Sequence, residues 1–321
     1  MSAGELHVVF GTGPVGLAVT DALTRRGKRV RVVNRRGVAD VLAGVEVTQG
    51  EVTDQAATAE LSVGAAVIYN CTNPPYTQWP ELFPALNRSI MNAAAKAGAK
   101  LVVMDNLYMY GPNNGRPLTE GLPYAATTRK GRVRAAMARE LLDAHARGDI
   151  QVAIGRASDF FGPRVRDSSF GERVFEPALA GKPVQVIGKP DLLHTASYVP
   201  DIGEALVTLG EHNTAFGRAW HLPAAETIST RAFIERVFAA TGQQPRLQVA
   251  PVFVLRAIGL FIPMLREVAE MGYEFEEPFI LDHGAFTQAF GGTVTPLDTA
   301  IRATVDWYRM HAEQHATKVS T

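Results

Sequence analysis

The feature that most restricts the fold of this chain is its N-terminal segment, Leu6-His7-Val8-Val9-Phe10-Gly11-Thr12-Gly13-Pro14-Val15-Gly16-Leu17. An apolar run too short for a helix ends in Gly-x-Gly-x-x-Gly, and apolar residues then recur at helical spacing. The pattern predicts a strand, a tight turn and a helix. Gly11 lets the chain turn, Gly13 lets the backbone approach a pyrophosphate, and Gly16 lets the helix pack closely on the strand. Because the helix N-terminus at Pro14 and Val15 faces the phosphates with its unpaired N–H groups, we expect this turn to bind a dinucleotide.

The second predicted strand, Lys28 to Val33, bears on the choice between NAD and NADP. After this strand an NAD site usually carries an Asp or Glu that binds the ribose hydroxyl, but this chain has Asn34-Arg35-Arg36. Two cations and no carboxylate favour a phosphate at that place, and therefore NADP over NAD. The alternative is that Arg35 and Arg36 are a solvated pair of loop residues.

Strands and helices alternate through the first half of the chain. Further strands are predicted at Val45–Gly50, Ala65–Asn70, Lys100–Met104 and Ile150–Ile154, with helices at Leu82–Ala97 and from Arg129 to His145. This alternation predicts an α/β fold with a parallel, doubly wound sheet. The loop from Cys71 to Tyr76 contains two adjacent prolines, so it cannot be helical and should lie at the carboxyl edge of the sheet, where such sheets bind ligands.

The alternation becomes irregular from about Arg164, which predicts a smaller mixed lobe that binds the substrate. We assign residues 1–165 to the sheet domain, with 190–222 returning to it, 166–189 and 223–295 to the substrate lobe, and 296–321 to a final helix. Short segments around Val184–Gly188 and a helix from Ser229 to Ala240 are expected in the lobe. The final helix, Pro296 to His311, is amphipathic.

Charge and cysteine content restrict the partners and the compartment. The chain has 321 residues, with 32 basic and 32 acidic side chains, so bulk charge indicates neither a nucleic-acid nor a membrane-surface partner. Cys71 is the single cysteine and is expected to be a buried structural thiol. No apolar targeting segment precedes the first strand, so a cytoplasmic location is expected. The apolar stretch Val249 to Leu265 contains Arg256 and prolines, which argues against a membrane span and favours packing over a pocket or a second subunit.

The order of several short motifs resembles the extended short-chain dehydrogenase/reductase superfamily, the NAD-dependent epimerase/dehydratase group. The motifs are Glu51-Val52-Thr53-Asp54, Tyr110-Gly111, Arg156 to Pro163, Tyr198 to Gly203, and Pro296-Leu297 leading to Asp306-Trp307-Tyr308. The resemblance implies a Rossmann domain with a smaller C-terminal substrate lobe. It also implies that Glu51 and Val52 contact the adenine and that Asn73 and Pro74 lie near the nicotinamide.

The catalytic positions depart from this family. Its members use a Ser or Thr, followed by Tyr-x-x-x-Lys, whose tyrosine exchanges the proton. Here Asn106 stands at the Ser/Thr position, Lys130 at the tyrosine position and Arg134 at the lysine position, and no Tyr-x-x-x-Lys occurs in the chain. Phe10 likewise stands where an extended member carries its first glycine. The chain therefore resembles an atypical member of the superfamily.

Three replacements for the missing tyrosine are open. Lys130 could act as the acid if burial and the cations Arg132 or Arg134 favour its neutral amine. Arg134 could hold the ribose, but it cannot exchange protons at neutral pH. Tyr108 or Tyr110 could supply a phenol from the other side of the cleft. The alternative is that the basic residues form a solvated helix face and that Tyr108 packs in the core.

Tyr76, Asp159 and His194 are the residues that we expect near the substrate. A histidine beside a carboxylate can act as a general acid or base near neutral pH, although a lone histidine is more often structural. A further group, Glu274, Glu276, Glu277, Asp282 and His283, lacks metal-ligand spacing. We expect no metal site there and predict a polar loop.

Two functions remain open at this stage. The first is an NADP-dependent oxidoreductase or epimerase-like enzyme that acts on a small carbonyl or hydroxyl compound. The second is an NADP(H)-binding sensor or regulatory protein that has lost catalysis. The resemblance also implies a homodimer formed through the helices at Leu82–Ala97 and Val133–His145.

Overall fold

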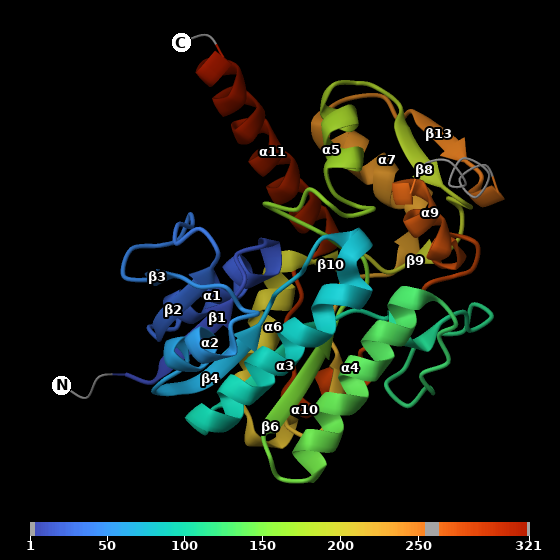
Figure 1. The fold of residues 1–321 in the computed structure, drawn as a ribbon. Coiled ribbons are helices and arrows are strands. Elements are labelled where there is room, and N and C mark those ends of the chain that lie inside the picture. Colours follow the sequence, from blue (N-terminus) through green and yellow to red (C-terminus); the bar gives the residue numbers. More distant parts are fainter. Residues whose placement is uncertain (1–3, 254–262, 320–321) are drawn as a thin grey trace.

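A parallel sheet of seven strands forms the centre of the molecule (Figure 1). The computed structural model describes residues 4–253 and 263–319. The strand order is β3-β2-β1-β4-β5-β6-β11, and every neighbouring pair is parallel. The strands are β1 (Leu6–Phe10), β2 (Arg29–Asn34), β3 (Glu46–Gln49), β4 (Ala65–Asn70), β5 (Lys100–Asp105), β6 (Gln151–Arg156) and β11 (Ala219–His221). The order reverses between β1 and β4, which confirms the predicted doubly wound sheet and places its ligand crevice at the carboxyl ends of these strands.

Helices cover both faces of this sheet (Figure 1). They are α1 (Pro14–Arg25) and α6 (Val199–Glu211) on one face, and α2 (Gln55–Leu61), α3 (Trp79–Ala97) and α4 (Arg129–Ala146) on the other. Helix α3 begins at Trp79 rather than at the predicted Leu82, because a helix tolerates proline in its first turn, where Pro80 lies.

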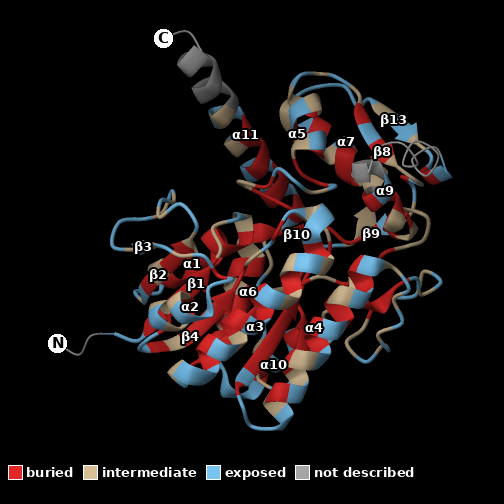
Figure 2. Cartoon of the chain, viewed as in Figure 1, coloured by how far each residue is buried: buried red, intermediate tan, exposed pale blue. Residues whose placement is uncertain are grey.

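The strands divide their apolar residues between these two layers. In β1, Val9 packs in the layer of α1 and α6, while Val8 and Phe10 pack in the layer of α3 and α4. Figure 2 shows the strands buried and the outer faces of the helices exposed. A parallel sheet covered on both faces requires such strands, which are apolar on both sides.

The second half of the chain adds a smaller mixed lobe (Figure 1). Its elements are α5 (Glu172–Leu179), β8 (Val184–Ile187), α7 (Thr230–Thr241), β13 (Leu247–Ala250), α9 (Pro263–Glu270) and α11 (Leu297–Val319). Phe161, Phe175 and Phe233 lie at its centre, and Tyr308 of α11 stacks on Phe175 with ring centroids 5.3 Å apart. The short segment expected around Val184 forms the strand β8, and the predicted helix from Ser229 to Ala240 is confirmed as α7, which Ser229 caps.

Short elements connect the sheet and the lobe. They are β7 (Phe160–Phe161), β9 (Leu193–His194), β10 (Ser197–Tyr198), β12 (Ile228–Ser229), α10 (Gly284–Phe290) and the single turns η1 (Tyr76–Gln78), η2 (Tyr108–Tyr110), η3 (Asn213–Ala215) and η4 (Gly272–Phe275). Helix α10 packs against β11, where Trp220 contacts Phe286 and Phe290. This part of the segment 223–295 therefore contributes to the core of the sheet domain.

The C-terminal helix and the apolar segment before α9 complete the chain. Helix α11 begins at Leu297 and runs to Val319, beyond the predicted end at His311. Most of the apolar stretch Val249–Leu265 lies outside the described residues. Within the two described ranges, no helix combines the length and the apolarity that crossing a membrane would need.

A buried histidine lies in the first strand. His7 is 1% exposed, and its ring stacks on Tyr69 with centroids 6.0 Å apart. Its Nε2 atom has no hydrogen-bond partner among the described residues. Burial, helped by the nearby charge of Lys28, lowers the pKa of His7 from 6.5 to about 4.

This histidine makes the stability of the fold sensitive to acid. Below pH 6.5 the unfolded chain binds a proton at His7, whereas the folded chain does so only near pH 4. The free energy of unfolding should therefore fall between these two values, by up to about 1.4 kcal/mol per pH unit. In His7→Phe this contribution is absent. The free energy of unfolding, measured with urea, should therefore change less steeply with pH between pH 4 and 6.5 than in wild type. The control His212→Phe, at an exposed histidine, should keep the wild-type slope. Equal slopes in wild type and His7→Phe would contradict the assignment.

Candidate functional site

The glycine turn after β1 has the geometry that a dinucleotide needs. Gly11 has a φ of +102°, and a Cβ there would lie 2.6 Å from the carbonyl oxygen of Cys71. A Cβ on Gly16 would lie 2.0 Å from the carbonyl oxygen of Gly11. These two glycines are therefore required by the fold. Gly13 differs from them, because a Cβ there would meet nothing within 4 Å among the described residues.

The N-terminus of α1 is open above this turn. Gly13 is the N-cap residue, and no side chain of the described residues caps the helix. The first turn contains no acidic side chain, and Pro14 opens it. The N–H groups of a first helical turn have no partner within the helix, so those of Val15 and Gly16 are available to an anion. The open space at Gly13 and the uncapped helix fit a pyrophosphate.

The loop after β2 is organised by one amide and presents two free cations. The side chain of Asn34 donates to Thr12 Oγ1 at 3.1 Å and accepts from the backbone N–H of Arg36 at 2.8 Å. The loop is thereby held beside the glycine turn. Arg35 and Arg36 are exposed, and neither guanidinium has a partner among the described residues. In contrast, Arg31 of the same strand pairs with Glu46 at 2.8 Å.

The remaining predicted cofactor residues follow β3 and β4 at the same edge of the sheet. Glu51 is exposed and Val52 is buried beside it. Asn73 is exposed, while the carbonyl of Pro74 accepts a hydrogen bond from the indole of Trp79 at 3.2 Å. The structure thus brings the predicted residues of four adjacent strands to one edge. Cys71 at this edge is buried, and burial raises its pKa to about 12, which confirms the predicted structural thiol.

At the end of β5, the Asp105 carboxylate lies between two buried arginines. Its Oδ1 is 3.4 Å from a terminal nitrogen of Arg134, and its Oδ2 accepts from Nε of Arg156 at 3.3 Å. The guanidinium of Arg134 also lies 4.0 Å from the ring centroid of Phe83 and 4.5 Å from that of Trp79. Its Nε has no partner among the described residues.

Asn106 and Tyr108 follow on the adjoining loop. The side-chain oxygen of Asn106 accepts from the backbone N–H of Tyr108 at 3.1 Å. The amide nitrogen of Asn106 has no partner among the described residues, so it remains able to donate. Burial raises the pKa of Tyr76, and it raises that of Tyr108 well above its usual range.

Lys130 is fully buried, which rules out the solvated helix face for this residue. Its ammonium forms an ion pair with Glu267 and lies 3.4 Å from Glu270, both on α9 of the lobe. It also lies 4.2 Å from the ring centroid of Tyr76. The charged groups that contact the ammonium are therefore carboxylates rather than the arginines considered from the sequence. Arg132, two residues further on, is exposed.

The lobe brings two polar groups to the same region. Nε2 of His194 lies 3.0 Å from Oδ2 of Asp159, which joins the predicted histidine and carboxylate. His194 also contacts the ring of Phe275 in η4, with centroids 5.5 Å apart. The neighbouring Glu274 is 2% exposed. The prediction of a polar loop was therefore wrong for Glu274, because η4 turns this residue inward.

Sequence reasoning missed three acidic residues of this region. Glu267 and Glu270 are three residues apart on one helix, a spacing that places both on one face. That spacing was the sequence signal from which a pair of acidic residues on one helical face could have been predicted. Glu274 offered none, since its charged neighbours in the sequence resemble those of a solvated loop.

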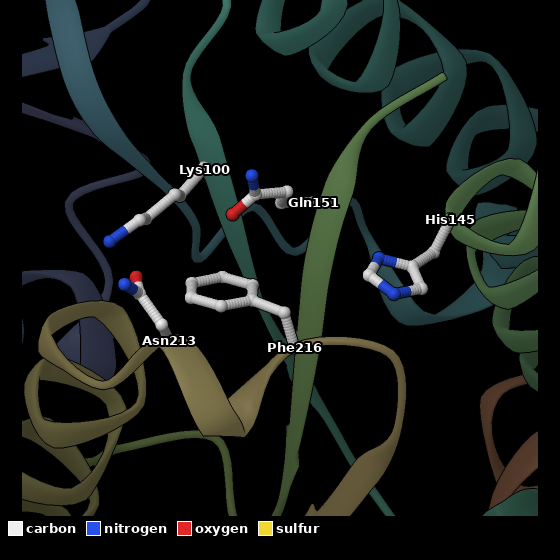
Figure 3. A pocket seen from close by; sticks show the side chains of 5 residues that line it. All are labelled: Lys100, His145, Gln151, Asn213 and Phe216. Atoms are coloured by element: carbon white, nitrogen blue, oxygen red, sulfur yellow. The ribbon is translucent and has the colours of Figure 1, made fainter. Parts of the chain in front are cut away.

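A separate cavity lies at the opposite, amino edge of the sheet. It has a volume of about 660 Å³ and is lined by Lys100, His145, Gln151, Asn213 and Phe216, as Figure 3 shows. Lys100 and Gln151 are the first residues of β5 and β6, so this cavity is far from the glycine turn. It contains none of the predicted site residues.

The fold and the glycine turn define a dinucleotide-binding α/β protein of the doubly wound type. The model of the NAD dependent epimerase/dehydratase family matches residues 8–221, from β1 to β11. The chain belongs to this family. A search of curated proteins finds no match.

Solved structures of epimerases share the fold at low sequence identity. An epimerase from Methanothermobacter thermautotrophicus has a TM-score of 0.80 at 13% identity, covering 97% of this chain and 94% of that chain. UDP-glucuronic acid 4-epimerase from Bacillus cereus, in complex with NAD, has 0.78 at 14%, covering 96% and 98%. UDP-N-acetylglucosamine 4-epimerase from Bacillus cereus has 0.77 at 12%, covering 95% and 97%. At these identities the likeness shows the fold alone.

The glycine turn yields a prediction that separates ligand binding from stability. In Gly13→Ala the added methyl group meets no protein atom within 4 Å, so the unfolding temperature should stay within about 2 °C of wild type. The same methyl group fills the space beside the open helix end, so dinucleotide affinity should fall at least about tenfold. Gly121→Ala, also at an open position, is the control and should change neither quantity. Unchanged affinity in Gly13→Ala would contradict the placement of the pyrophosphate.

The buried lysine yields a second prediction, which concerns stability. Lys130→Met leaves Glu267 and Glu270 without their shared cation, so chemical denaturation should show a loss of about 3–5 kcal/mol. Adding Glu267→Gln and Glu270→Gln removes the uncompensated charges and should restore part of that loss. Arg132→Met, on the exposed face of the same helix, should cost less than about 0.5 kcal/mol. If Lys130→Met costs no more than Arg132→Met, the ion pair contributes nothing to the fold.

Proposed function

We propose that this protein is an NADP-dependent oxidoreductase or epimerase-like enzyme that acts on a small carbonyl or hydroxyl compound. The observation that carries the proposal is that one edge of the sheet holds both the open turn at Gly13 and a group of buried polar side chains. Asn73 and Pro74 connect the two, since they lead directly into η1 with Tyr76. A cofactor site that opens onto such a group is what a hydride-transfer enzyme requires.

The two free guanidinium groups support NADP as the cofactor. Arg35 and Arg36 lie at the end of β2, where the ribose of the adenosine half binds in dinucleotide sites of this type. A pair of unpartnered cations favours a 2′-phosphate, and an arginine can bind a phosphate with two parallel hydrogen bonds. The neighbouring Asn34 holds the loop and offers no carboxylate to a ribose hydroxyl.

The other residues of the site would bind the dinucleotide and the substrate. The N–H groups of Val15 and Gly16 would bind the pyrophosphate, and Glu51 and Val52 would lie against the adenine. When bound, the nicotinamide supplies or accepts a hydride. The free amide nitrogen of Asn106 would donate to the substrate oxygen.

Four further residues would act around the nicotinamide and the substrate. Arg134, whose Nε has no partner among the described residues, would hold the nicotinamide ribose. Asp159 and His194 would bind a substrate hydroxyl, with Tyr76 on the opposite side.

A sensor or regulatory protein that binds NADP(H) without catalysis is the second candidate. The observation that favours it is the environment of Lys130, because its buried ammonium is already engaged by Glu267 and Glu270. The extent of the lobe favours the enzyme, since a sensor has less need of a full substrate lobe.

A fluorescence titration of the purified protein with NADPH, and separately with NADH, tests the cofactor. A panel of aldehydes, ketones and UDP-sugars, with NADPH or NADP⁺, tests the reaction, and the UDP-sugars are included because structural relatives are named for epimerisation of such compounds. Turnover of one panel member establishes the enzyme. Tight NADPH binding without any turnover would favour the sensor, and binding of neither dinucleotide would overturn both candidates.

The arginine pair yields the prediction on cofactor choice. The double variant Arg35→Ala/Arg36→Ala loses both phosphate ligands, so its NADPH dissociation constant should rise at least about thirtyfold, and its NADH dissociation constant less than about threefold. Arg29→Ala removes a cation from the amino end of the same strand and should change neither constant. Equal losses of NADPH and NADH affinity in the double variant would refute the phosphate site.

Two further properties stay predictions of the sequence. These are the cytoplasmic location and a homodimer formed through α3 and α4. Sedimentation of the purified protein tests the second, with a dimer as the expected species.

A further inference from the structure

Glu274 is a buried carboxyl group, and one of its oxygens has no hydrogen-bond partner among the described residues. It lies in η4, which follows α9 in the lobe, and it is 2% exposed. Its Oε1 atom has no hydrogen-bond partner among the described residues, and neither does the hydroxyl of the adjacent Tyr273. A buried polar atom without a hydrogen-bond partner costs free energy. Two such atoms on adjacent residues therefore point to a ligand that forms the missing hydrogen bonds.

The surroundings of Glu274 place it in the candidate active site. Helix α9 packs against both η4, which carries Glu274, and η1, which carries Tyr76. The ring of Phe275, the residue after Glu274, stacks on His194, which pairs with Asp159. The ammonium of Lys130, at the position that corresponds to the catalytic tyrosine of the family, lies 4.2 Å from the ring centroid of Tyr76. The element that carries Glu274 therefore borders the candidate active site.

Burial favours the protonated form of Glu274. It raises the pKa of the carboxyl well above the usual range, and the like charge of Asp159 acts in the same direction. None of the basic side chains that the structure describes forms an ion pair with it. In its protonated form this carboxyl group can donate a hydrogen bond and a proton.

The other candidates for the acid are less suitable. Burial raises the pKa of both Tyr76 and Tyr108 above the ordinary value of a phenol. Lys130 is held by Glu267 and Glu270, so it cannot stabilise a phenolate in the way the family lysine does. A neutral carboxylic acid is a stronger acid than either phenol, and it is already desolvated.

We propose that Glu274 is the general acid-base residue of this site and takes the place of the missing tyrosine, an inference that rests on the proposed function. In reduction, NADPH, when bound, would supply the hydride to the carbonyl carbon, and the Oε–H of Glu274 would give its proton to the carbonyl oxygen. The products are an alcohol, NADP⁺ and the Glu274 carboxylate, which takes a proton from solvent before the next turnover. Tyr273 donates its hydroxyl hydrogen to the same substrate oxygen or to a neighbouring hydroxyl.

Glu274→Gln tests the catalytic role. The amide keeps the size and hydrogen-bonding capacity of the acid but has no proton to give, so kcat for carbonyl reduction should fall at least about 100-fold. The NADPH dissociation constant should stay within about twofold, because Glu274 does not bind the phosphates. Glu277→Gln, at a partly exposed residue of the same loop, should keep wild-type kcat. The wild-type rate should also fall as the pH rises through the pKa of Glu274, because only the acid form donates.

An infrared measurement tests the same residue without turnover. At pH 7 the wild-type protein should show the carbonyl stretch of a protonated carboxyl group, which should vanish in Glu274→Gln and persist in Glu277→Gln. If Glu274→Gln keeps this band, or if its kcat stays within about threefold of wild type, the inference is overturned. The proposed function still stands in that case, provided that the wild-type protein binds NADPH and turns over a substrate. Failure of the wild-type protein to bind NADPH overturns the proposed function, and the catalytic role of Glu274 with it.

Discussion

The carboxylate of Asp105 holds two buried arginines, and the geometry of the candidate site depends on this interaction. Arg134 lies on α4 and Arg156 at the end of β6, and each contacts one oxygen of Asp105 at 3.3–3.4 Å. A buried charge without a partner costs several kcal/mol, on the order of 3–5 for a broken pair, so this carboxylate fixes the helix against the sheet. Lys130 lies one turn before Arg134 on the same face of α4, and its position follows from the same contact. The spacing between the sheet edge and helix α4 is therefore set by electrostatics as well as by apolar packing.

A chain of hydrogen bonds runs from Arg156 to Asp282, which follows η4 in the sequence. The guanidinium donates to the hydroxyl of Tyr110 at 2.6 Å, and this hydroxyl lies 2.8 Å from Nε2 of His221. The other ring nitrogen of His221 lies 2.9 Å from the carbonyl oxygen of Asp282. Each of these buried side chains finds a hydrogen-bond partner in the next one, as a polar network in a low-dielectric interior requires. Because Asp282 closes the loop that begins at η4, the network anchors one end of the segment that carries Glu274.

The sequence predicted what depends on local geometry and missed what depends on distant partners. Gly16 and the doubly wound sheet were predictable, because a glycine turn and a strand-helix alternation are local patterns that permit few folds. The environment of Lys130 was not, since its partner Glu267 lies 137 residues further along the chain. Glu274 was predicted to be in a polar loop for a related reason. Its neighbours in the sequence are acidic, and only the packing of η4 against the lobe shows that this one side chain turns inward.

Lys130 on α4 and the two acidic residues on α9, Glu267 and Glu270, form one buried ion-pair cluster. An ammonium in a buried position requires counter-charge, and Glu267 and Glu270 supply it from a single helical face. The same pairing holds the ammonium above the ring of Tyr76. Helix α4 therefore anchors the lobe at the position where the resemblance to the family predicts a proton donor. The proposed hydride transfer at this edge needs an acid. The lobe that the lysine holds in place carries Glu274, whose Oε1 atom has no hydrogen-bond partner among the described residues.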